Sequence, residues 1–124
     1  MLFGIGSDII EVKRMDEMVA KGRLTLEAIF TKREIEYCET KNRKAEHYAA
    51  RFAAKEACLK AMRTGWQGGF AFSDIEIVRE ESGQPRILVH GRVERFFAEH
   101  HIQQTWISLS HTRELAVAFI ILEN

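Results

Sequence analysis

One long helical segment, from about Ala45 to Arg63, constrains the fold of this chain more than any other feature. A helix turns by about 100° per residue, which places five side chains within about 80° of one another: Tyr48, Phe52, Glu56, Leu59 and Arg63. Glu56 therefore interrupts a mostly apolar face, and a carboxylate turned toward a core is costly unless a cation or hydrogen-bond donors meet it. The alternative is a solvated Glu56–Lys60 pair, which stabilises a helix by only about 0.2–0.5 kcal/mol.

The composition predicts a packed, soluble domain without an overall charge. Of the 124 residues, 46% are hydrophobic and 29% are charged, and the 18 basic residues balance the 18 acidic ones. No overall field attracts nucleic acid or a membrane, so an electrostatic partner has to bind a local patch. Cys38 and Cys58 lack metal-binding spacing and favour a reducing cytoplasm over a disulfide scaffold. The first acid comes too early for a signal peptide, and no apolar run approaches the roughly 20 residues of a membrane span. We therefore expect a cytoplasmic protein that binds neither nucleic acid nor membranes.

The other segments predict a mixture of short helices and strands. We expect strands at 2–7 (ending at Asp8), 74–79, 86–90, 106–110 and 115–122, and helices at 11–20, 31–40 and 93–101. Thr31 to Glu34 matches a capping box, and the last two strands form a hairpin around 111–114. The run 115–122 lacks alternation, which predicts a strand covered on both faces, with a neighbouring subunit as one cover. We infer a single α+β domain over residues 1–124, with an antiparallel sheet packed against the long helix.

Four features of the sequence are candidates for chemistry: Asp8 at a strand end, Glu56 on the helix, Lys60 ahead of a glycine-containing loop, and His111 at another strand end. Each has a simpler explanation, because acids and histidines often satisfy turns and glycines often end helices. Neither zinc-ligand spacing nor a Gly-x-Ser-x-Gly nucleophile motif is present. Two separated acids and a lysine beside a glycine loop, without a nucleophile, together indicate Mg²⁺-assisted phosphate chemistry.

Five blocks carry a resemblance to a known family. They are GIGSDIIEVKR from Gly4, RFAAKEACLKA from Arg51, FSDIEI from Phe72, the turn SGQP from Ser82, and ISLSHTRELAVAFIILE from Ile107. In this order, over nearly the whole chain, they resemble the short, single-domain class of 4′-phosphopantetheinyl transferases, the holo-(acyl-carrier-protein) synthases. One departure is that the family usually places Gly-Thr-Gly after the central helix, where this chain has Arg63-Thr64-Gly65.

The resemblance implies an enzyme that transfers 4′-phosphopantetheine from coenzyme A to a serine of apo acyl carrier protein and leaves adenosine 3′,5′-bisphosphate. Asp8 and Glu56 are then the Mg²⁺ ligands, and Lys60 joins them as a catalytic residue at the pyrophosphate. The proton of the serine passes to a metal-bound water or to a carboxylate such as Glu56. The implied coenzyme A-binding residues are Arg51, Lys60, Thr64, Gly65, Gly83, Gln84, Pro85, His111 and Thr112.

The resemblance also implies two protein partners. The carrier protein is acidic, and a stripe of Arg14, Met18 and Lys21 at helical spacing would bind it, although such a stripe can also be a solvated surface. The short class forms homotrimers with its sites at subunit interfaces. A non-catalytic domain that binds coenzyme A or a carrier protein is the competing interpretation, and one half of a longer, two-lobed transferase is another.

Overall fold

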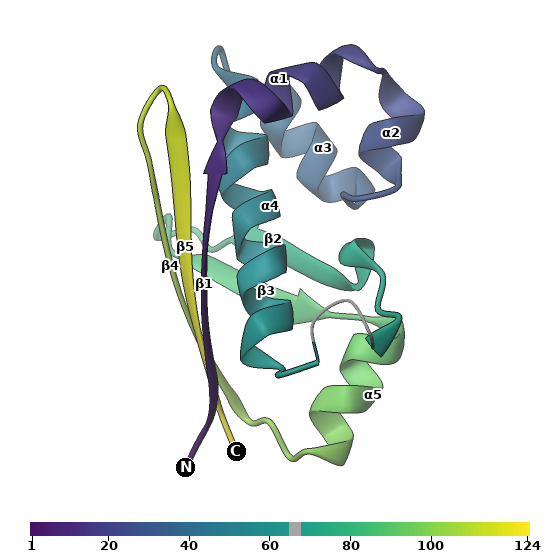
Figure 1. Ribbon diagram of the computed structural model, residues 1–124, viewed down its shortest axis with the longest axis vertical. Helices are drawn as coiled ribbons and strands as arrows, with labels where there is room; N and C mark the ends of the chain where they lie inside the picture. The colour runs from purple at the N-terminus through teal and green to yellow at the C-terminus, as the bar shows by residue number, and fades with distance from the viewer. Residues whose placement is uncertain (65–67) are drawn as a thin grey trace.

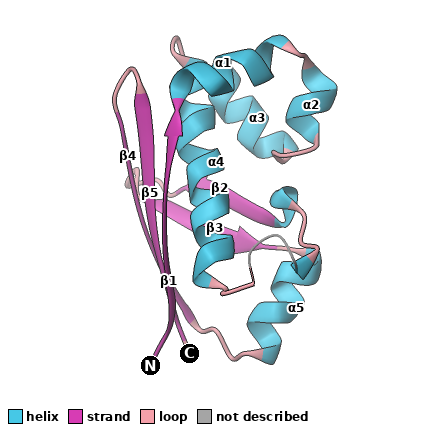
Figure 2. Cartoon of the chain, in the orientation of Figure 1, coloured by secondary structure: helices cyan, strands magenta, loops and turns pink. Residues whose placement is uncertain are grey.

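A computed structural model describes residues 1–64 and 68–124 of the chain (Figures 1 and 2). In chain order the elements are β1 (Leu2–Glu11), α1 (Val12–Ala20), α2 (Arg23–Glu27), α3 (Lys32–Glu39), α4 (Lys44–Ala61), the 3₁₀ helix η2 (Phe72–Asp74), β2 (Ile75–Arg79), β3 (Pro85–Val89), α5 (Gly91–Glu99), β4 (Gln104–His111) and β5 (Leu115–Glu123). The α+β class predicted from the sequence is confirmed. No helix within the described residues is both long enough and apolar enough to cross a membrane.

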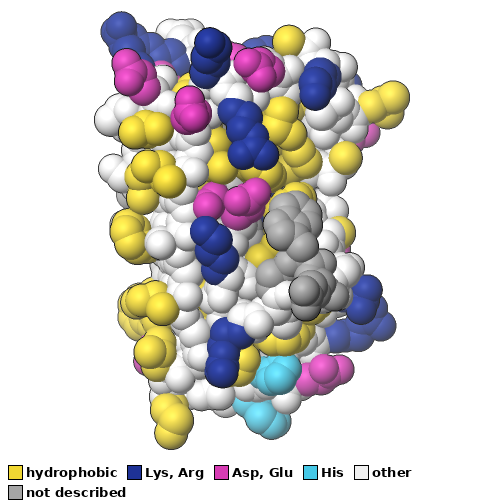
Figure 3. Space-filling model, viewed as in Figure 1, with side chains coloured by type: hydrophobic (Ala, Val, Ile, Leu, Met, Phe, Trp, Pro, Cys, Tyr) yellow, Lys and Arg dark blue, Asp and Glu magenta, His cyan; other side chains and the backbone are white. Residues whose placement is uncertain are grey.

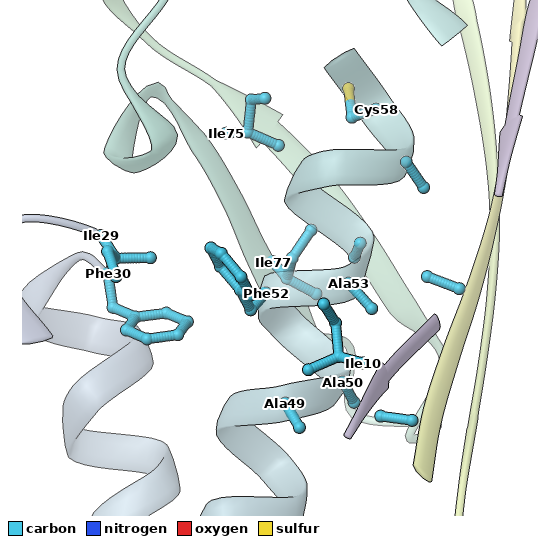
Figure 4. Packing of buried hydrophobic residues seen from close by; sticks show 14 of the residues in the cluster. Ile10, Ile29, Phe30, Ala49, Ala50, Phe52, Ala53, Cys58, Ile75 and Ile77 are labelled. Atoms are coloured by element: carbon cyan, nitrogen blue, oxygen red, sulfur yellow. The ribbon is translucent and has the colours of Figure 1, made fainter. Parts of the chain in front are cut away.

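Helix α4 runs through the middle of the molecule, along a three-stranded antiparallel sheet in the order β1–β5–β4 (Figure 1). The separate β2–β3 hairpin packs on another side of the helix. Alanines dominate the buried surface of α4, and small side chains let a helix approach its neighbours closely. Figure 4 shows Phe52 leaving α4 toward Phe30, whereas Ile10 reaches the helix from β1. The predicted central helix is therefore correct.

Two local predictions need correction, and a third is confirmed. Strand β1 does not end at Asp8 but continues to Glu11, because Asp8 pairs with Ala118 and the following residues keep pairing with β5. Helix α2 was not predicted, since five residues are too few for a helical repeat to show. The predicted capping box at Thr31 is present, with both of its reciprocal hydrogen bonds. Cys38 and Cys58 are buried free thiols.

One face of the three-stranded sheet is apolar but uncovered in the protomer. Strand β5 alternates: Ala116, Ala118, Ile120 and Leu122 are buried. On the outer face the register places Ile5 opposite Ile121 and Trp106 on its other side. Ile5, Ile9, Trp106 and Phe119 are each more than half exposed. The described residues therefore cover β5 on one face only, and they do not supply the predicted second cover.

Candidate functional site

Two glycines of β1 determine how closely this strand approaches α4. A Cβ atom at Gly4 would lie 1.8 Å from the carbonyl oxygen of Ala61, and one at Gly6 would lie 1.9 Å from that of Ala57. The strand and helix backbones are thus in direct contact, which only glycine permits. This contact places Asp8, two residues after Gly6, beside the α4 turn that carries Glu56 and Lys60.

The site itself consists of two acids and one lysine. The ammonium of Lys60 donates to Asp8 Oδ1 at 3.0 Å and to the Ser7 carbonyl at 2.9 Å. The Asp8 side chain is only 11% exposed, and its other oxygen, Oδ2, is buried with no hydrogen-bond donor among the described residues. Figure 3 shows acidic side chains in the middle of this face, with basic side chains above and below them. The sequence prediction that Asp8, Glu56 and Lys60 form one group agrees with this geometry.

Glu56 is the member of the group whose pKa is shifted. Burial raises the pKa of its carboxyl from 4.5 to about 7, and Asp8 adds to the shift through its negative charge and by accepting a hydrogen bond from the protonated form. The positive charges of Arg14 and Lys60 oppose that shift. When both acids are ionised, Asp8 Oδ2 has no donor among the described residues, and the two negative charges repel each other. A cation between the two carboxylates would give Asp8 Oδ2 a partner and would offset the repulsion between the two negative charges.

The donor set fits Mg²⁺ better than a metal held entirely by protein. Within residues 1–64 and 68–124, no group of three or more His, Cys, Asp or Glu side chains is placed to hold a metal ion. Mg²⁺ is usually held by one or two carboxylates, with waters and substrate phosphate oxygens completing its octahedron. Asp8 and Glu56 supply that number of carboxylates, and the buried Oδ2 atom without a donor is the ligand atom that such an ion needs.

The acid pair predicts a pH-dependent stability in the absence of metal. The folded-state pKa of Glu56 lies above its usual value. Its protonation therefore contributes to the free energy of unfolding in full below about pH 4.5, and this contribution is lost as the pH rises through about 7. In Glu56→Gln the side chain stays neutral, so we expect a flatter profile and, above pH 7, a larger unfolding free energy than in the wild type. Urea unfolding with a chelator, at about pH 5 and about pH 8, measures both. Parallel profiles for the two proteins would contradict the shift.

A second group of predicted residues lies around Tyr37, on the far side of α4. Arg51 is 2% exposed, its guanidinium lies 4.1 Å from the Tyr37 ring centre, and its Nε atom has no partner among the residues described. Lys41 and Arg79 also lie over this ring, at 4.7 and 5.9 Å. His111 Nδ1 lies 3.0 Å from Glu46 Oε1. Three permanent cations around one ring, with His111 nearby, form a surface suited to a phosphate group.

His47 connects the parts of this second group. Its ring lies 5.3 Å from that of His111 and 5.9 Å from that of Tyr37. Burial lowers the pKa of His47, and the positive charges of His111, Arg51, Lys41 and Arg79 lower it further. The ring therefore adds little charge of its own while it packs between the two binding candidates.

The two groups occupy opposite sides of α4. Nine positions separate Arg51 from Lys60 and also His47 from Glu56. Nine positions correspond to about two and a half helical turns, so each pair points in opposite directions. Since α4 lies in the core, the structure does not bring Arg51 and His111 to the Asp8–Glu56 group of the same protomer.

The remaining predicted coenzyme A-binding residues are placed as follows. Thr64 follows α4 and is half-buried, whereas Gly65 lies outside the described residues. Gln84 and Pro85 line a groove that also contains Trp106 and Phe119 of the exposed sheet face, with Gly83 in the adjoining turn. Thr112 caps the β4–β5 hairpin, where its hydroxyl accepts from the backbone N–H groups of Glu114 and Leu115.

Arg63, where the family usually has glycine, lies in a left-handed backbone conformation. Arg63 has a φ of 71°, the left-handed conformation that usually favours glycine at the end of a helix. Its guanidinium lies 5.6 Å from the Phe3 ring centre. The arginine therefore holds a backbone conformation that glycine adopts more easily, and it adds a contact with β1.

One residue of the predicted carrier-binding stripe, Arg14, lies close enough to the acid pair to act on Glu56. Arg14 is exposed, lies 6.0 Å from the Phe52 ring centre and acts electrostatically on Glu56. Met18 is half-buried against the core, and Lys21 is exposed at the end of α1. The sequence reasoning missed how close Arg14 lies to Glu56, and it missed the roles of Gly4 and Gly6. Glycines at alternate positions before Asp8, and alanines four apart at 57 and 61, were the available signal for the close packing.

Comparisons with known proteins agree with these motifs. A family model described as the 4′-phosphopantetheinyl transferase superfamily matches residues 4–120. Holo-(acyl-carrier-protein) synthase from Geotalea daltonii is 43% identical over an alignment of 125 residues that covers 100% of both chains. The enzyme of that name from Geobacter sulfurreducens is 42% identical, covering 100% of this chain and 99% of its own.

Solved structures of proteins with this name share the fold. The crystal structure from Neisseria meningitidis has a TM-score of 0.90 at 30% identity and covers 100% of both chains. The structure from Bacillus anthracis, in complex with CoA (3′,5′-ADP), has a TM-score of 0.81 at 35% identity and covers 98% of this chain and 96% of its own. Since the matches extend over essentially the whole chain, it belongs to the 4′-phosphopantetheinyl transferase superfamily.

Proposed function

We propose that this protein is a holo-(acyl-carrier-protein) synthase. It transfers the 4′-phosphopantetheine group of coenzyme A to a serine of an apo acyl carrier protein and releases adenosine 3′,5′-bisphosphate. The observation that carries the proposal is the half-buried pair of acids, Asp8 and Glu56, with Lys60 hydrogen-bonded to Asp8. These residues come from two separate family motifs, and the contact of β1 with α4 brings them together.

Each residue of the site has a part in the transfer. Asp8 and Glu56 would hold Mg²⁺, which when bound neutralises negative charge on the pyrophosphate. We assign the proton of the serine hydroxyl to Glu56 as the serine oxygen attacks the β-phosphorus, because the other acid, Asp8, is already paired with Lys60. The bond from that phosphorus to the bridging oxygen breaks, and its electron pair leaves with adenosine 3′,5′-bisphosphate. Lys60 gives two of its three N–H groups to Ser7 and Asp8, and we assign the third to a pyrophosphate oxygen.

We expect Lys60→Ala to weaken coenzyme A binding more than carrier binding. A lost hydrogen bond to a charged group costs about 1.5–3 kcal/mol, which corresponds to a rise in Kd of roughly 10- to 150-fold. Titration calorimetry with coenzyme A and Mg²⁺ measures this change. The KM for the carrier protein is the internal control, because Arg14, Met18 and Lys21 lie on α1. Unchanged coenzyme A affinity would remove Lys60 from the pyrophosphate.

Coenzyme A binds between two copies of the chain in this proposal. The Asp8–Glu56 group and the Arg51–His111 group face opposite sides of a buried helix, so one ligand reaches both only if a second protomer supplies one of them. The exposed apolar sheet face supports such an assembly, because large uncovered apolar patches mark protein interfaces. We propose a homotrimer, in agreement with the family resemblance. Light scattering after gel filtration tests it, and a monomer at assay concentration would refute it.

The carrier protein binds the stripe of Arg14, Met18 and Lys21. We expect Arg14→Glu to raise the KM for an acidic carrier strongly, and the wild-type KM to rise with salt. Because Arg14 also lowers the pKa of Glu56, reversing its charge should move the pH profile of kcat to higher pH. Steady-state kinetics at several pH values separate the two effects.

Lys21→Glu is the matched control for Arg14→Glu, since Lys21 lies on the stripe but at the end of α1. It should raise the carrier KM and leave the pH profile unchanged. A normal carrier KM in both variants would show that the carrier docks on another surface.

One experiment tests the function directly. The protein is incubated with apo acyl carrier protein, coenzyme A and Mg²⁺, and mass spectrometry measures the carrier. We expect the mass to increase by one phosphopantetheine group and adenosine 3′,5′-bisphosphate to accumulate in equal amount. Binding of coenzyme A or carrier without any mass change would instead support the non-catalytic binding domain.

A further inference from the structure

Helix α4 is held from a second direction by Lys55, whose side chain is completely buried next to Glu56 in the sequence. The ammonium of Lys55 donates to Glu34 Oε1 at 2.8 Å, to the Phe72 carbonyl at 3.1 Å and to the Ile75 carbonyl. A charged ammonium has three protons, and all three meet an acceptor here, whereas a neutral amine has only two. Burial lowers the pKa of Lys55, whereas the charge of Glu34 and its hydrogen bond oppose that shift. Since three acceptors surround the nitrogen, and one of them is a carboxylate, the geometry favours the charged form with all of its donors in use.

Glu34 connects this lysine to the surrounding elements. Its Oε1 atom also accepts from the Thr31 backbone N–H at 2.9 Å, and its Oε2 atom accepts from the Ile77 N–H at 2.8 Å. One buried ion pair thus joins α4 to the start of α3, to η2 and to β2. Thr31 extends the network outward, since its hydroxyl donates to Glu76 at 2.7 Å.

Stability alone does not explain such a pair. Replacing a buried ion pair with apolar side chains of similar volume is often neutral or even stabilising. What the pair adds is geometry: it fixes both the rotation of α4 about its axis and its position along that axis. On the β1 side, the contacts at Gly4 and Gly6 fix only the distance of closest approach. Successive side chains leave a helix about 100° apart, so any rotation allowed at Lys55 also moves Glu56 relative to Asp8.

We propose that Lys55 is a positioning residue for the transfer reaction, which acts through its ion pair with Glu34 to hold the Glu56 and Lys60 side chains in register with Asp8. The inference rests on the proposed function, because it assigns the pair a role at the same site. Residues that orient metal ligands without touching the metal typically change metal affinity or activity by 10- to 100-fold when replaced.

The test uses the double variant Lys55→Met/Glu34→Gln in the full chain. Methionine keeps most of the length of lysine without its charge, and glutamine keeps an oxygen that accepts a backbone N–H. We expect a folded protein whose kcat falls roughly 10- to 100-fold, with Mn²⁺ binding, measured by electron paramagnetic resonance without substrates, weakened by a similar factor. The KM for the carrier should stay at its wild-type value, because the carrier stripe lies on α1.

Val93→Ala is the control for lost stability, since Val93 is buried in α5, an element that supplies no hydrogen-bond partner to Lys55 or Glu34. It should lower the melting temperature but leave kcat and Mn²⁺ affinity unchanged in the folded protein. If the double variant does not fold, Glu34→Gln alone takes its place, with a smaller loss of kcat and Mn²⁺ affinity expected. Wild-type kcat and Mn²⁺ affinity in the folded variant would overturn the inference. A wild-type protein that transfers nothing would instead overturn the proposed function.

Discussion

Asp8→Ala and Glu56→Ala are each expected to lower kcat by about three orders of magnitude or more. Stabilisation of charge by a bound metal contributes several kcal/mol to such reactions, and each 1.4 kcal/mol is a factor of ten in rate. Either variant leaves a single carboxylate where the proposed mechanism needs two. Transfer of phosphopantetheine at saturating Mg²⁺ and coenzyme A is the measurement.

Neither variant is expected to unfold the protein. Asp8→Ala removes a like charge next to Glu56 and a buried oxygen that has no donor in the described part of the chain. It also removes the pair with Lys60, but this lysine is 55% exposed, and exposed ion pairs contribute only about 0–1 kcal/mol. Without metal at neutral pH, the unfolding free energy of Asp8→Ala should therefore equal or exceed that of the wild type.

Glu11→Ala is the matched control for both variants. Glu11 is an exposed acid at the end of the same strand, and it should retain wild-type turnover. Wild-type turnover of Asp8→Ala or Glu56→Ala at saturating Mg²⁺ would refute the metal assignment. A folded but inactive Glu11→Ala would show that general loss of negative charge, rather than the acid pair, explains the effect.

The sequence predicted those elements whose signals are local. Helix α4, the capping box at Thr31 and the β4–β5 hairpin each form through interactions between residues that lie close together in the sequence. The end of β1 was predicted incorrectly because aspartate favours turns, whereas in the protein Asp8 pairs across to Ala118. Pairing with β5 is a tertiary contact, and it overrides the local preference of a single residue.

The sequence named the residues of the candidate site but not their geometry. The motifs named Asp8, Glu56 and Lys60, yet the Asp8–Lys60 bond depends on a backbone contact between β1 and α4. The ring of cations around Tyr37 combines side chains from three parts of the chain, Lys41, Arg51 and Arg79, which share no local pattern. No sequence pattern distinguishes Lys55 from the other charged residues of α4, whereas its burial against Glu34 does.

Gly6→Ala is expected to reduce both stability and turnover. The added Cβ would lie 1.9 Å from the Ala57 carbonyl oxygen, so β1 and α4 have to separate by about 1.5 Å to reach ordinary contact at 3.4 Å. Overpacking of this kind costs about 1–3 kcal/mol or more. The same shift moves Asp8 away from Glu56, and a displacement of about 1 Å can lower a rate by about 100-fold. Urea unfolding and steady-state kinetics measure the two losses.

A variant at a second glycine shows whether the loss of turnover follows from the loss of stability or from the separation of β1 and α4. Gly22→Ala also adds one methyl group, at a φ of 105° and with nothing within 4 Å, so it costs only backbone strain of about 1–2 kcal/mol. It should lower the melting temperature and leave kcat near the wild-type value. In Gly6→Ala the clash is with a backbone oxygen, so adding Ala57→Gly cannot relieve it and activity should stay low in the double variant. Recovery of activity there would mean that side-chain packing, rather than the backbone contact of β1 with α4, positions Asp8 beside Glu56.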